Sequence, residues 1–317
     1  MSVNVLVSFA FFPTEDLAAV RTKLVCGKLM IDSGAFTAYS VGKVIKLGDY
    51  AEFLHTWRGQ WDHAVTLDTI GDPVATRRST RALHEQGLPV MPVFTRGESV
   101  KEFDAMVRDC GYVCVGGGVG MSAAVLVQRT RLLQRRASEL GGGIHALGMG
   151  AVGRVRQAMP YTADSSNISN TFQYGQIRYF NGREICSVKV NNKIGLLKRW
   201  EYLRAHDINV ADLAQNGKMP TGEIRGQLMT AMSLSYACAD EWLHAVGTVP
   251  VPRGVPDPRP GPHLYSSICG SHLLPGVIEL DYKLHHGYSP PLWQRYGRHH
   301  VCVERTPLLH DELSAGQ

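Results

Sequence analysis

The sequence lacks any apolar run that approaches the ~20 residues needed to cross a membrane as a helix. It also lacks a basic segment ahead of its first apolar run, residues 3–9, so we expect a strand there and no signal peptide. The seven cysteines are an odd number in a 317-residue chain, which favours reduced thiols over a disulfide framework. These absences predict a cytoplasmic protein without a membrane partner.

The bulk composition sets few further limits on function. Hydrophobic residues make up 44% of the chain, enough to bury a full core. The net charge of +5, with a sequence pI near 8.8, allows a polyanionic partner but does not require one. Composition and charge are thus compatible with many functions.

Apolar runs typical of strands alternate with helical patterns along most of the chain. The runs are residues 3–9, 29–31, 64–67, 89–94, 112–115, 144–147, 161–163 and 185–190. Eight βα units within about 250 residues predict an α/β fold of the (β/α)8 TIM-barrel type. An open, doubly wound sheet is the structural alternative, because the order of strands cannot be read from the sequence.

Six prolines between positions 250 and 262 interrupt this alternation. We therefore expect three parts: a catalytic barrel over residues 1–247, a Pro-rich linker over residues 248–263, and a small basic, His-rich C-terminal appendage over residues 264–317.

Three carboxylates follow apolar runs directly. Asp32 and Asp164 each begin a short turn of small residues, and Asp68 ends the third run. Barrel enzymes present catalytic groups at the carboxyl ends of their strands. Two such acids predict a nucleophile and a proton carrier acting on one bond, whereas Asp68 can accept two N–H groups from a guanine-like edge. Ordinary helix caps or buried, paired aspartates explain the same letters.

Small residues at the strand ends predict close approach of a planar ligand to the backbone. Phe36 could stack on such a ligand, with Ser33 beside it. Glycines at the ends of later runs, among them Gly117 and Gly118, expose backbone N–H and C=O groups to such a ligand. Residues 148–153 also match the G-x-G-x-x-G dinucleotide pattern, but the helix that follows must end by Pro160, which is too short for that fingerprint.

Two further groups suggest binding sites of other kinds. Cys269, His272, His300 and Cys302 could hold a structural zinc ion, although single buried cysteines and surface histidines explain the same letters. A basic cluster on and after the run at 185–190 is the candidate for phosphate contacts, and consists of Lys189, Lys193, Lys198 and Arg199.

The order of these motifs over residues 28–170 resembles the queuine tRNA-ribosyltransferase (tRNA-guanine transglycosylase) superfamily. Residues 32–36, Asp-Ser-Gly-Ala-Phe, are similar to its Asp-Ser-Gly-Gly-aromatic segment, and residues 147–150, Leu-Gly-Met-Gly, resemble the stretch before its nucleophile. The resemblance implies a modified TIM barrel in which Asp164 is the nucleophile, Asp32 the acid/base, and Asp68 the reader of the guanine edge. It also implies that Arg96, Gly148 and Met149 lie against the base.

The chain also departs from that family. It has no Cys-x-Cys-x-x-Cys zinc motif, and Arg96 or Thr95 stands where a base-contacting Gln is expected. This compact pattern is most like the DpdA branch, the DNA transglycosylases of phages and bacteria, which would place a phage-encoded protein in the host cytoplasm. The resemblance implies exchange of guanine in DNA for a free base such as 7-cyano-7-deazaguanine, with no required cofactor.

Three alternatives remain open. The polymer could be tRNA instead of DNA. A barrel that binds a base or nucleic acid without catalysis would use the same surface. A TIM-barrel enzyme acting on a small phosphorylated metabolite would use the loop at 148–153 for its phosphate.

Overall fold

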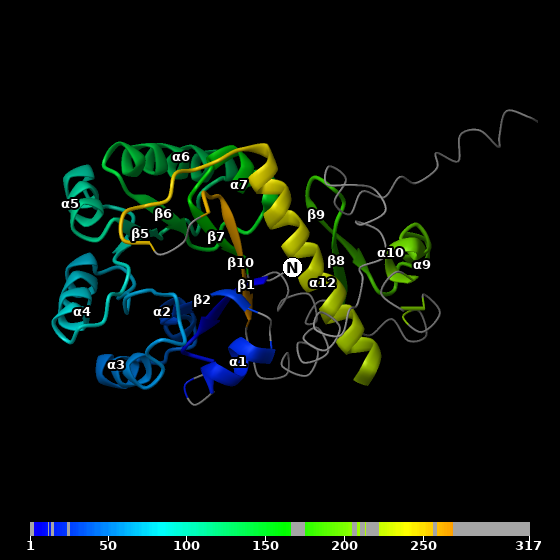
Figure 1. Ribbon diagram of the computed structural model, residues 1–317, viewed down its shortest axis with the longest axis horizontal. Helices are drawn as coiled ribbons and strands as arrows, with labels where there is room; N and C mark the ends of the chain where they lie inside the picture. The colour runs from blue at the N-terminus through cyan, green and yellow to red at the C-terminus, as the bar shows by residue number, and fades with distance from the viewer. Residues whose placement is uncertain are drawn as a thin grey trace, which may run out of the picture.

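The computed structural model describes residues 3–11, 13, 16–23, 26–165, 175–204, 208–209, 213, 222–255 and 259–268. Its centre is an eight-stranded parallel sheet with the order β3-β2-β1-β10-β7-β6-β5-β4 (Figure 1). The strands are β1 (Val3–Ser8), β2 (Cys26–Asp32), β3 (His63–Ala64), β4 (Val93–Phe94), β5 (Tyr112–Val115), β6 (Gly143–Ala146), β7 (Thr162–Ser165) and β10 (His263–Ile268).

A parallel bridge between Val65 and Met91 links the chain after β3 to the chain before β4, the two outermost strands in this order. Backbone hydrogen bonds run both ways, from Thr66 N–H to the Met91 carbonyl (2.9 Å) and from Met91 N–H to the Ala64 carbonyl (2.7 Å). The sheet is thus curled, and the α/β fold is compatible with the predicted TIM-type barrel.

The eighth strand is not the one that the sequence pattern predicts. The run at 185–190 forms β9 (Ile185–Lys189), which pairs antiparallel with β8 (Gln176–Phe180) in a separate two-stranded sheet. The short connection between them is stabilised by the Asn181 side chain, which accepts hydrogen bonds from the N–H groups of Arg183 and Glu184. Local hairpin pairing therefore takes this apolar run away from the large sheet.

The place of the eighth strand is filled by β10, which pairs in parallel with both β1 and β7. The large sheet consequently continues beyond residue 247, and the predicted boundary there does not mark its end. The Pro-rich segment leads into β10, and a bridge between Val249 and Gly261 holds its two ends together. Residues 269–317, most of the expected appendage, lie outside the described residues.

The helices between the strands begin where the sequence supplies caps. Asp72 accepts a hydrogen bond from Ala75 N–H, with Pro73 at the first helical position, and Ser99 forms a capping box with Glu102. The helices are α1 (Leu17–Lys23), α2 (Ala35–Ser40), α3 (Leu47–Thr56), α4 (Pro73–Glu85), α5 (Val100–Cys110), α6 (Ala123–Glu139), α7 (Val152–Ala158), α9 (Lys193–Leu197), α10 (Trp200–Arg204) and α12 (Gly222–Val246).

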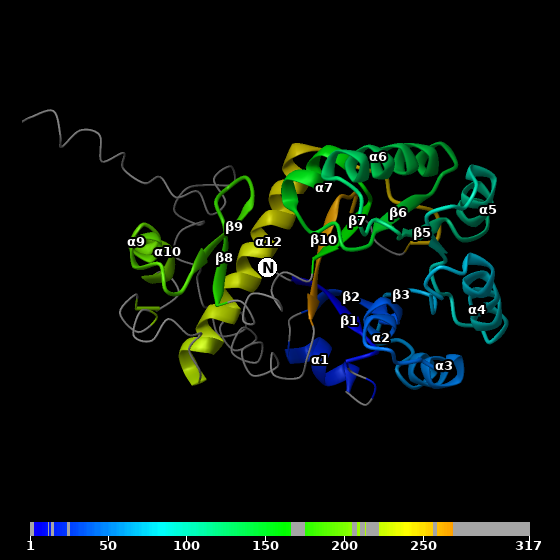
Figure 2. The same cartoon turned by 180° about the vertical axis from the view of Figure 1, so that it is seen from behind.

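The long helix α12 joins the two sheets. It packs on β1 and β10 on one side and on β8 and β9 on the other, and both views place it between them (Figures 1 and 2). Within the large sheet, a separate apolar cluster draws residues from most strands: Leu6, Met30, Val65, Met91, Val93, Tyr112, Cys114, Tyr161, Val249 and Tyr265. Among the described helices, none is long and apolar enough to cross a membrane.

Candidate active site

Three predicted carboxylates gather at the carboxyl end of the large sheet. Asp32 is the last residue of β2, Asp164 lies near the end of β7, and Asp68 follows β3. The buried thiol of Cys114 on β5 interacts electrostatically with all three. Burial raises the pKa of this thiol well above its ordinary value, and the negative charges of Asp32, Asp164 and Asp68 raise it further. The sheet therefore brings together acids that are far apart in the sequence.

Asp164 is held in place by the loop that follows β6. Gly148 donates its backbone N–H to Asp164 Oδ1 at 2.6 Å, and the carboxylate residue is only 7% exposed. A Cβ on Gly150 would lie 2.1 Å from the Cβ of Ser165, so only glycine lets this loop approach the end of β7. The glycine-rich loop thus holds the carboxylate in position, because the Gly148 N–H points at Asp164.

A buried histidine, which the sequence reading missed, stands beside Asp164. His145 on β6 is fully buried, and its Nε2 lies 3.4 Å from Asp164 Oδ1. Its Nδ1 hydrogen-bonds the Thr162 hydroxyl at 2.7 Å, and that hydroxyl also bonds the hydroxyl of Tyr112. A polar chain of side chains from three neighbouring strands therefore leads to Asp164. A histidine inside an otherwise apolar strand, Gly-Ile-His-Ala, is the signal that could have revealed it.

The carboxylate of Asp32 has different surroundings from that of Asp164, and they shift its pKa. Burial, followed by the negative charge of Asp164, raises the pKa of Asp32 to about 7, although its carboxylate accepts the Gly34 N–H at 2.9 Å. Gly34 has a positive φ of 76°, and a Cβ there would lie 2.4 Å from the Ala10 Cβ. The Asp-Ser-Gly turn therefore needs glycine at its third position, and it buries Ser33 to 1% exposure.

Asp68 is tied to the helix that follows it. Thr76 on α4 donates its hydroxyl to Asp68 Oδ1 at 2.8 Å. Burial raises the pKa of Asp68 despite this hydrogen bond, and nearby Glu98 adds to the rise. One carboxylate oxygen of Asp68 thus has a partner in the protein.

The predicted base contacts at the ends of β4 and β5 lie side by side. Gly117 has a positive φ of 71°, and a Cβ there would meet the Arg96 backbone nitrogen at 2.8 Å. The loop around Arg96 is shaped by Glu98, whose carboxylate accepts the Thr95 N–H at 2.6 Å and pairs with Arg77. Arg96 and Gly117 are exposed, and Gly118 is partly so, which leaves this corner open to a ligand.

Phe36 and Met149 differ sharply in exposure. Phe36, in the first turn of α2, is 55% exposed, as a stacking residue must be. The Met149 side chain is 1% exposed and belongs to the main hydrophobic core. Any contact of Met149 with a base would have to come from its backbone.

The basic cluster lies on the second, smaller sheet and not on the eighth strand of the large one. Lys189 ends β9, Lys193 begins α9, and both side chains are exposed, as is Lys198. The Arg199 guanidinium lies over the Tyr179 ring at 4.9 Å. The expectation that these residues follow the last barrel strand is wrong, because β9 belongs to the hairpin.

The candidate zinc residues Cys269, His272, His300 and Cys302 fall outside the described residues. No protein-family model matches the chain, and no curated protein matches it either.

Proposed function

We propose that this protein is a pentosyltransferase that exchanges guanine in DNA for a free 7-deazaguanine, such as 7-cyano-7-deazaguanine, through a covalent aspartyl-sugar intermediate. The observation that carries the proposal is the pair Asp164 and Asp32. They lie at the same end of one sheet, where the Gly148 N–H holds the carboxylate of the first, and burial and Asp164 raise the pKa of the second to about 7. We also propose that the bridge at Val65 and Met91 closes the sheet into a (β/α)8 barrel.

The nucleophile is Asp164. Its carboxylate attacks C1′ of the target deoxyguanosine, a C1′–O bond forms, and the bond from C1′ to guanine N9 breaks. Guanine takes the bonding electron pair and receives a proton. The incoming base then attacks C1′ through its own N9, breaks the ester and loses a proton. Dividing one difficult displacement into two is the general advantage of a covalent carboxylate.

Asp32 carries the proton. A general acid/base is most effective when its pKa lies near the working pH, and the pKa of Asp32 is raised to about 7 by burial and by Asp164. The Gly148 N–H meanwhile stabilises the charged form of Asp164. Two aspartates with different surroundings thereby take different roles, which is how paired carboxylates divide acid and nucleophile.

The base is read by groups around these two acids. The Asp68 oxygen that does not bond Thr76 can accept an N–H from the guanine edge. Exposed Phe36 supplies a stacking face, and Arg96, Gly117 and Gly118 offer a cation and backbone groups at the next strand ends. No redox cofactor takes part in these steps.

The protein binds the DNA on either side of a flipped nucleotide, because a base inside a duplex cannot reach the site. Next to Phe36 the chain presents Tyr39, which is 65% exposed, followed by exposed Lys43 and Lys46. Aromatic faces interleaved with basic groups suit a nucleic-acid strand. A second basic surface for phosphates lies on or next to β9 and α9 and consists of Lys189, Lys193, Lys198 and Arg199. Both elements lie on the side of α12 away from the large sheet (Figure 2).

The rival functions fit less well. An enzyme acting on a small phosphorylated metabolite would need the N–H groups of the 148–153 loop to bind the phosphate, but the Gly148 N–H is directed at Asp164. A binding protein without catalysis has no use for a carboxylate whose pKa is raised to about 7 beside a second one. A tRNA enzyme shares the same chemistry, so substrate comparison must separate it from the DNA enzyme.

The test is incubation of the protein with labelled 7-cyano-7-deazaguanine and either DNA or tRNA, followed by mass spectrometry of the released nucleosides. We expect label in deoxynucleosides, with binding to DNA that weakens as salt rises. Label in tRNA alone would overturn the DNA assignment and keep the reaction. Label in neither polymer, with folded protein, would overturn the reaction.

A further inference from the structure

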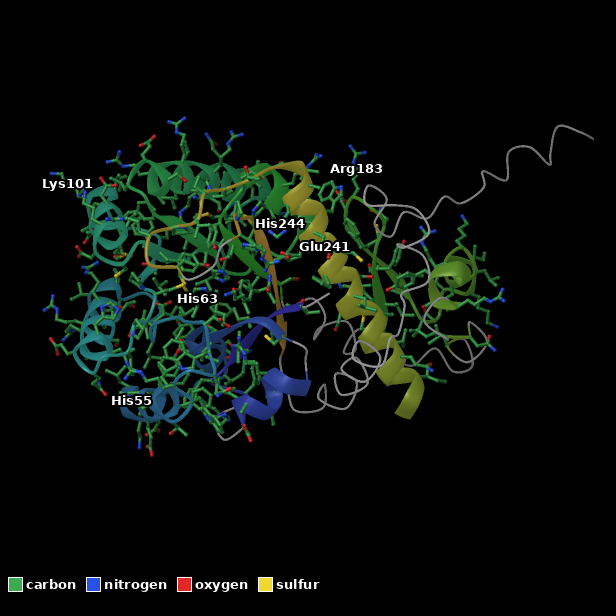
Figure 3. The ribbon with its side chains drawn as sticks, in the orientation of Figure 1. His55, His63, Lys101, Arg183, Glu241 and His244 are labelled. Atoms are coloured by element: carbon green, nitrogen blue, oxygen red, sulfur yellow. The ribbon has the colours of Figure 1, made fainter. Side chains whose placement is uncertain are left out.

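A second cluster of chemically active side chains lies where α12 meets the start of β10. Asp240 and His244 are four residues apart on α12, so they share one face of the helix. His263 is the first residue of β10 and is 2% exposed. One ligand atom from each of these three side chains lies within 4.8 Å of the others, and Figure 3 shows His244 on α12 beside β10.

The two histidines are oriented by their hydrogen bonds. His263 Nε2 lies 3.2 Å from the Arg259 carbonyl, which can only accept, so Nε2 carries the proton. The lone pair of His263 is then on Nδ1, and this atom faces His244 Nε2 at 2.8 Å. A metal-binding histidine commonly has one nitrogen on the ion and donates the other N–H to a carbonyl, as His263 Nε2 does here.

The carboxylate is oriented as well. Asp240 Oδ1 accepts a short hydrogen bond from the Leu264 N–H, the residue after His263. The helix and the strand are therefore fixed relative to each other at this point, and the three donor atoms are fixed with them. Outer hydrogen bonds of this kind hold ligands in position before an ion arrives.

We propose that Asp240, His244 and His263 form a zinc site. The donor set of two imidazole nitrogens and one carboxylate oxygen is one that Zn²⁺ accepts, with water as the fourth ligand. The ion replaces the proton between the imidazoles, and that proton moves to Nδ1 of His244. Bound in this way, zinc ties the last described helix to the strand that pairs with both β1 and β7.

This site is separate from the proposed catalytic centre. His263 opens β10 at its amino end, whereas Asp32 and Asp164 lie at or near the carboxyl ends of their strands. Its role is to stabilise the fold, and its existence does not depend on transglycosylase activity. It also differs in chemistry from the candidate set Cys269, His272, His300 and Cys302, which would place sulfur on the metal.

The experiment uses the full chain without an affinity tag, stripped with a chelator, dialysed, and titrated with Zn²⁺ or with Co²⁺ as a spectroscopic probe. Metal content per chain, the visible absorption of Co²⁺ and the thermal midpoint are measured. We expect one equivalent bound through nitrogen and oxygen, and a midpoint that rises with zinc. Loss of a ligand in His244→Ala should weaken binding by at least ~100-fold, more than loss of an outer partner would. Asp240→Asn should weaken it as well.

The matched control is His55→Ala, which removes an exposed histidine from α3 and should leave binding unchanged. Where His244→Ala does not fold, His244→Gln tests the same ligand with less loss of volume. Binding well below one equivalent would overturn the proposal. So would equal affinity in the wild type and the His244 variant, or an intense sulfur-to-cobalt absorption from the only bound ion. Base exchange is not measured, so failure here leaves the proposed activity unaffected.

Discussion

Two aspartates at opposite ends of the neighbouring strands β3 and β2 have opposite surroundings. Asp62, immediately before β3, is at the amino end and pairs with Arg21 at 2.8 Å and with Lys28 at 3.6 Å. Burial alone would raise its pKa, but the hydrogen bond and charge of Arg21 and the Leu29 N–H outweigh burial and lower it. Asp32, at the carboxyl end of β2, has no cation partner among the described residues, and its pKa is raised to about 7 by burial and by Asp164.

The comparison separates what stabilises the fold from what suits it to chemistry. At the amino end, opposite charges are placed together, which favours the folded state. At the carboxyl end, carboxylates are placed near one another at a cost in stability. Sites that perform acid–base chemistry require such shifted groups, because ordinary carboxylates are fully ionised at neutral pH.

The largest expected effect comes from removing the proposed nucleophile. Asp164→Asn should abolish base exchange, because an amide cannot form the ester with C1′, while its oxygen can still accept the Gly148 N–H and keep the loop in place. Denaturing gels of protein mixed with DNA should show a covalent adduct for the wild type and none for the variant. Exposed Asp49→Asn on α3 is the control, and near-normal exchange by Asp164→Asn would remove this residue from the mechanism.

Asp32→Asn should slow exchange on the order of 10²–10⁴-fold, the usual contribution of a general acid/base. The wild-type rate should change with a group titrating near pH 7, and the variant should lose that dependence.

The same substitution should change how the stability of the folded protein depends on pH. Because the folded pKa is above the unfolded one, the wild type loses stability as pH rises from about 4 to 7. The variant should therefore be the more stable protein above pH 7, as denaturant titrations at several pH values can check.

His145→Phe tests whether the buried polar chain positions the nucleophile. Without an imidazole beside Asp164 the carboxylate can shift, and we expect a loss in kcat on the order of 10²-fold, as for small misplacements of reacting groups. The KM for the free base should stay the same. His84→Gln, at the amino end where His84 bonds the Val90 carbonyl, is the control. A variant that loses stability but keeps wild-type kcat would make His145 a purely structural residue.

Asp62→Asn should give the smallest effect on exchange and a clear one on stability. Loss of the ion pairs with Arg21 and Lys28 should lower the free energy of unfolding at pH 7 by about 1–2 kcal/mol, since the pair is only partly buried. The pKa of Asp62 is lowered in the folded state, so this stabilisation should vanish as pH falls below about 4. If Asp62→Asn slows exchange as much as Asp32→Asn does, the amino end of the sheet is not purely structural and the contrast between the two ends is wrong.

Much of the sheet could be predicted, because parallel strands buried on both faces leave continuous apolar runs. The runs before Asp32 and Asp164 are strands, and both acids lie near each other as expected. The helix predicted at 223–246 is α12. Local patterns suffice for these elements since each is defined by residues close in the chain.

The errors have a common physical cause, which is that the position of a strand or side chain depends on its partner, and a single apolar run does not reveal that partner. The run at 185–190 is as apolar as a barrel strand, and only its neighbour β8 makes it a hairpin. Conversely, β10 reads His-Leu-Tyr-Ser-Ser-Ile after a series of prolines, a weak strand signal that sheet pairing overrides. His145 was missed for a similar reason, because its partners Thr162 and Tyr112 come from other strands.

The position of β10 also has a consequence for how the chain folds during synthesis. Strands β3-β2-β1 and β7-β6-β5-β4 can pair and be joined through the Val65–Met91 bridge, but the gap between β1 and β7 stays open until residues 263–268 leave the ribosome. During that time both strands present unpaired N–H and C=O groups, which can pair with another chain. A sheet completed by its latest strand folds slowly, because loop entropy must be lost before the contacts form. Truncation before residue 263 should therefore yield an aggregating protein and not a smaller folded sheet.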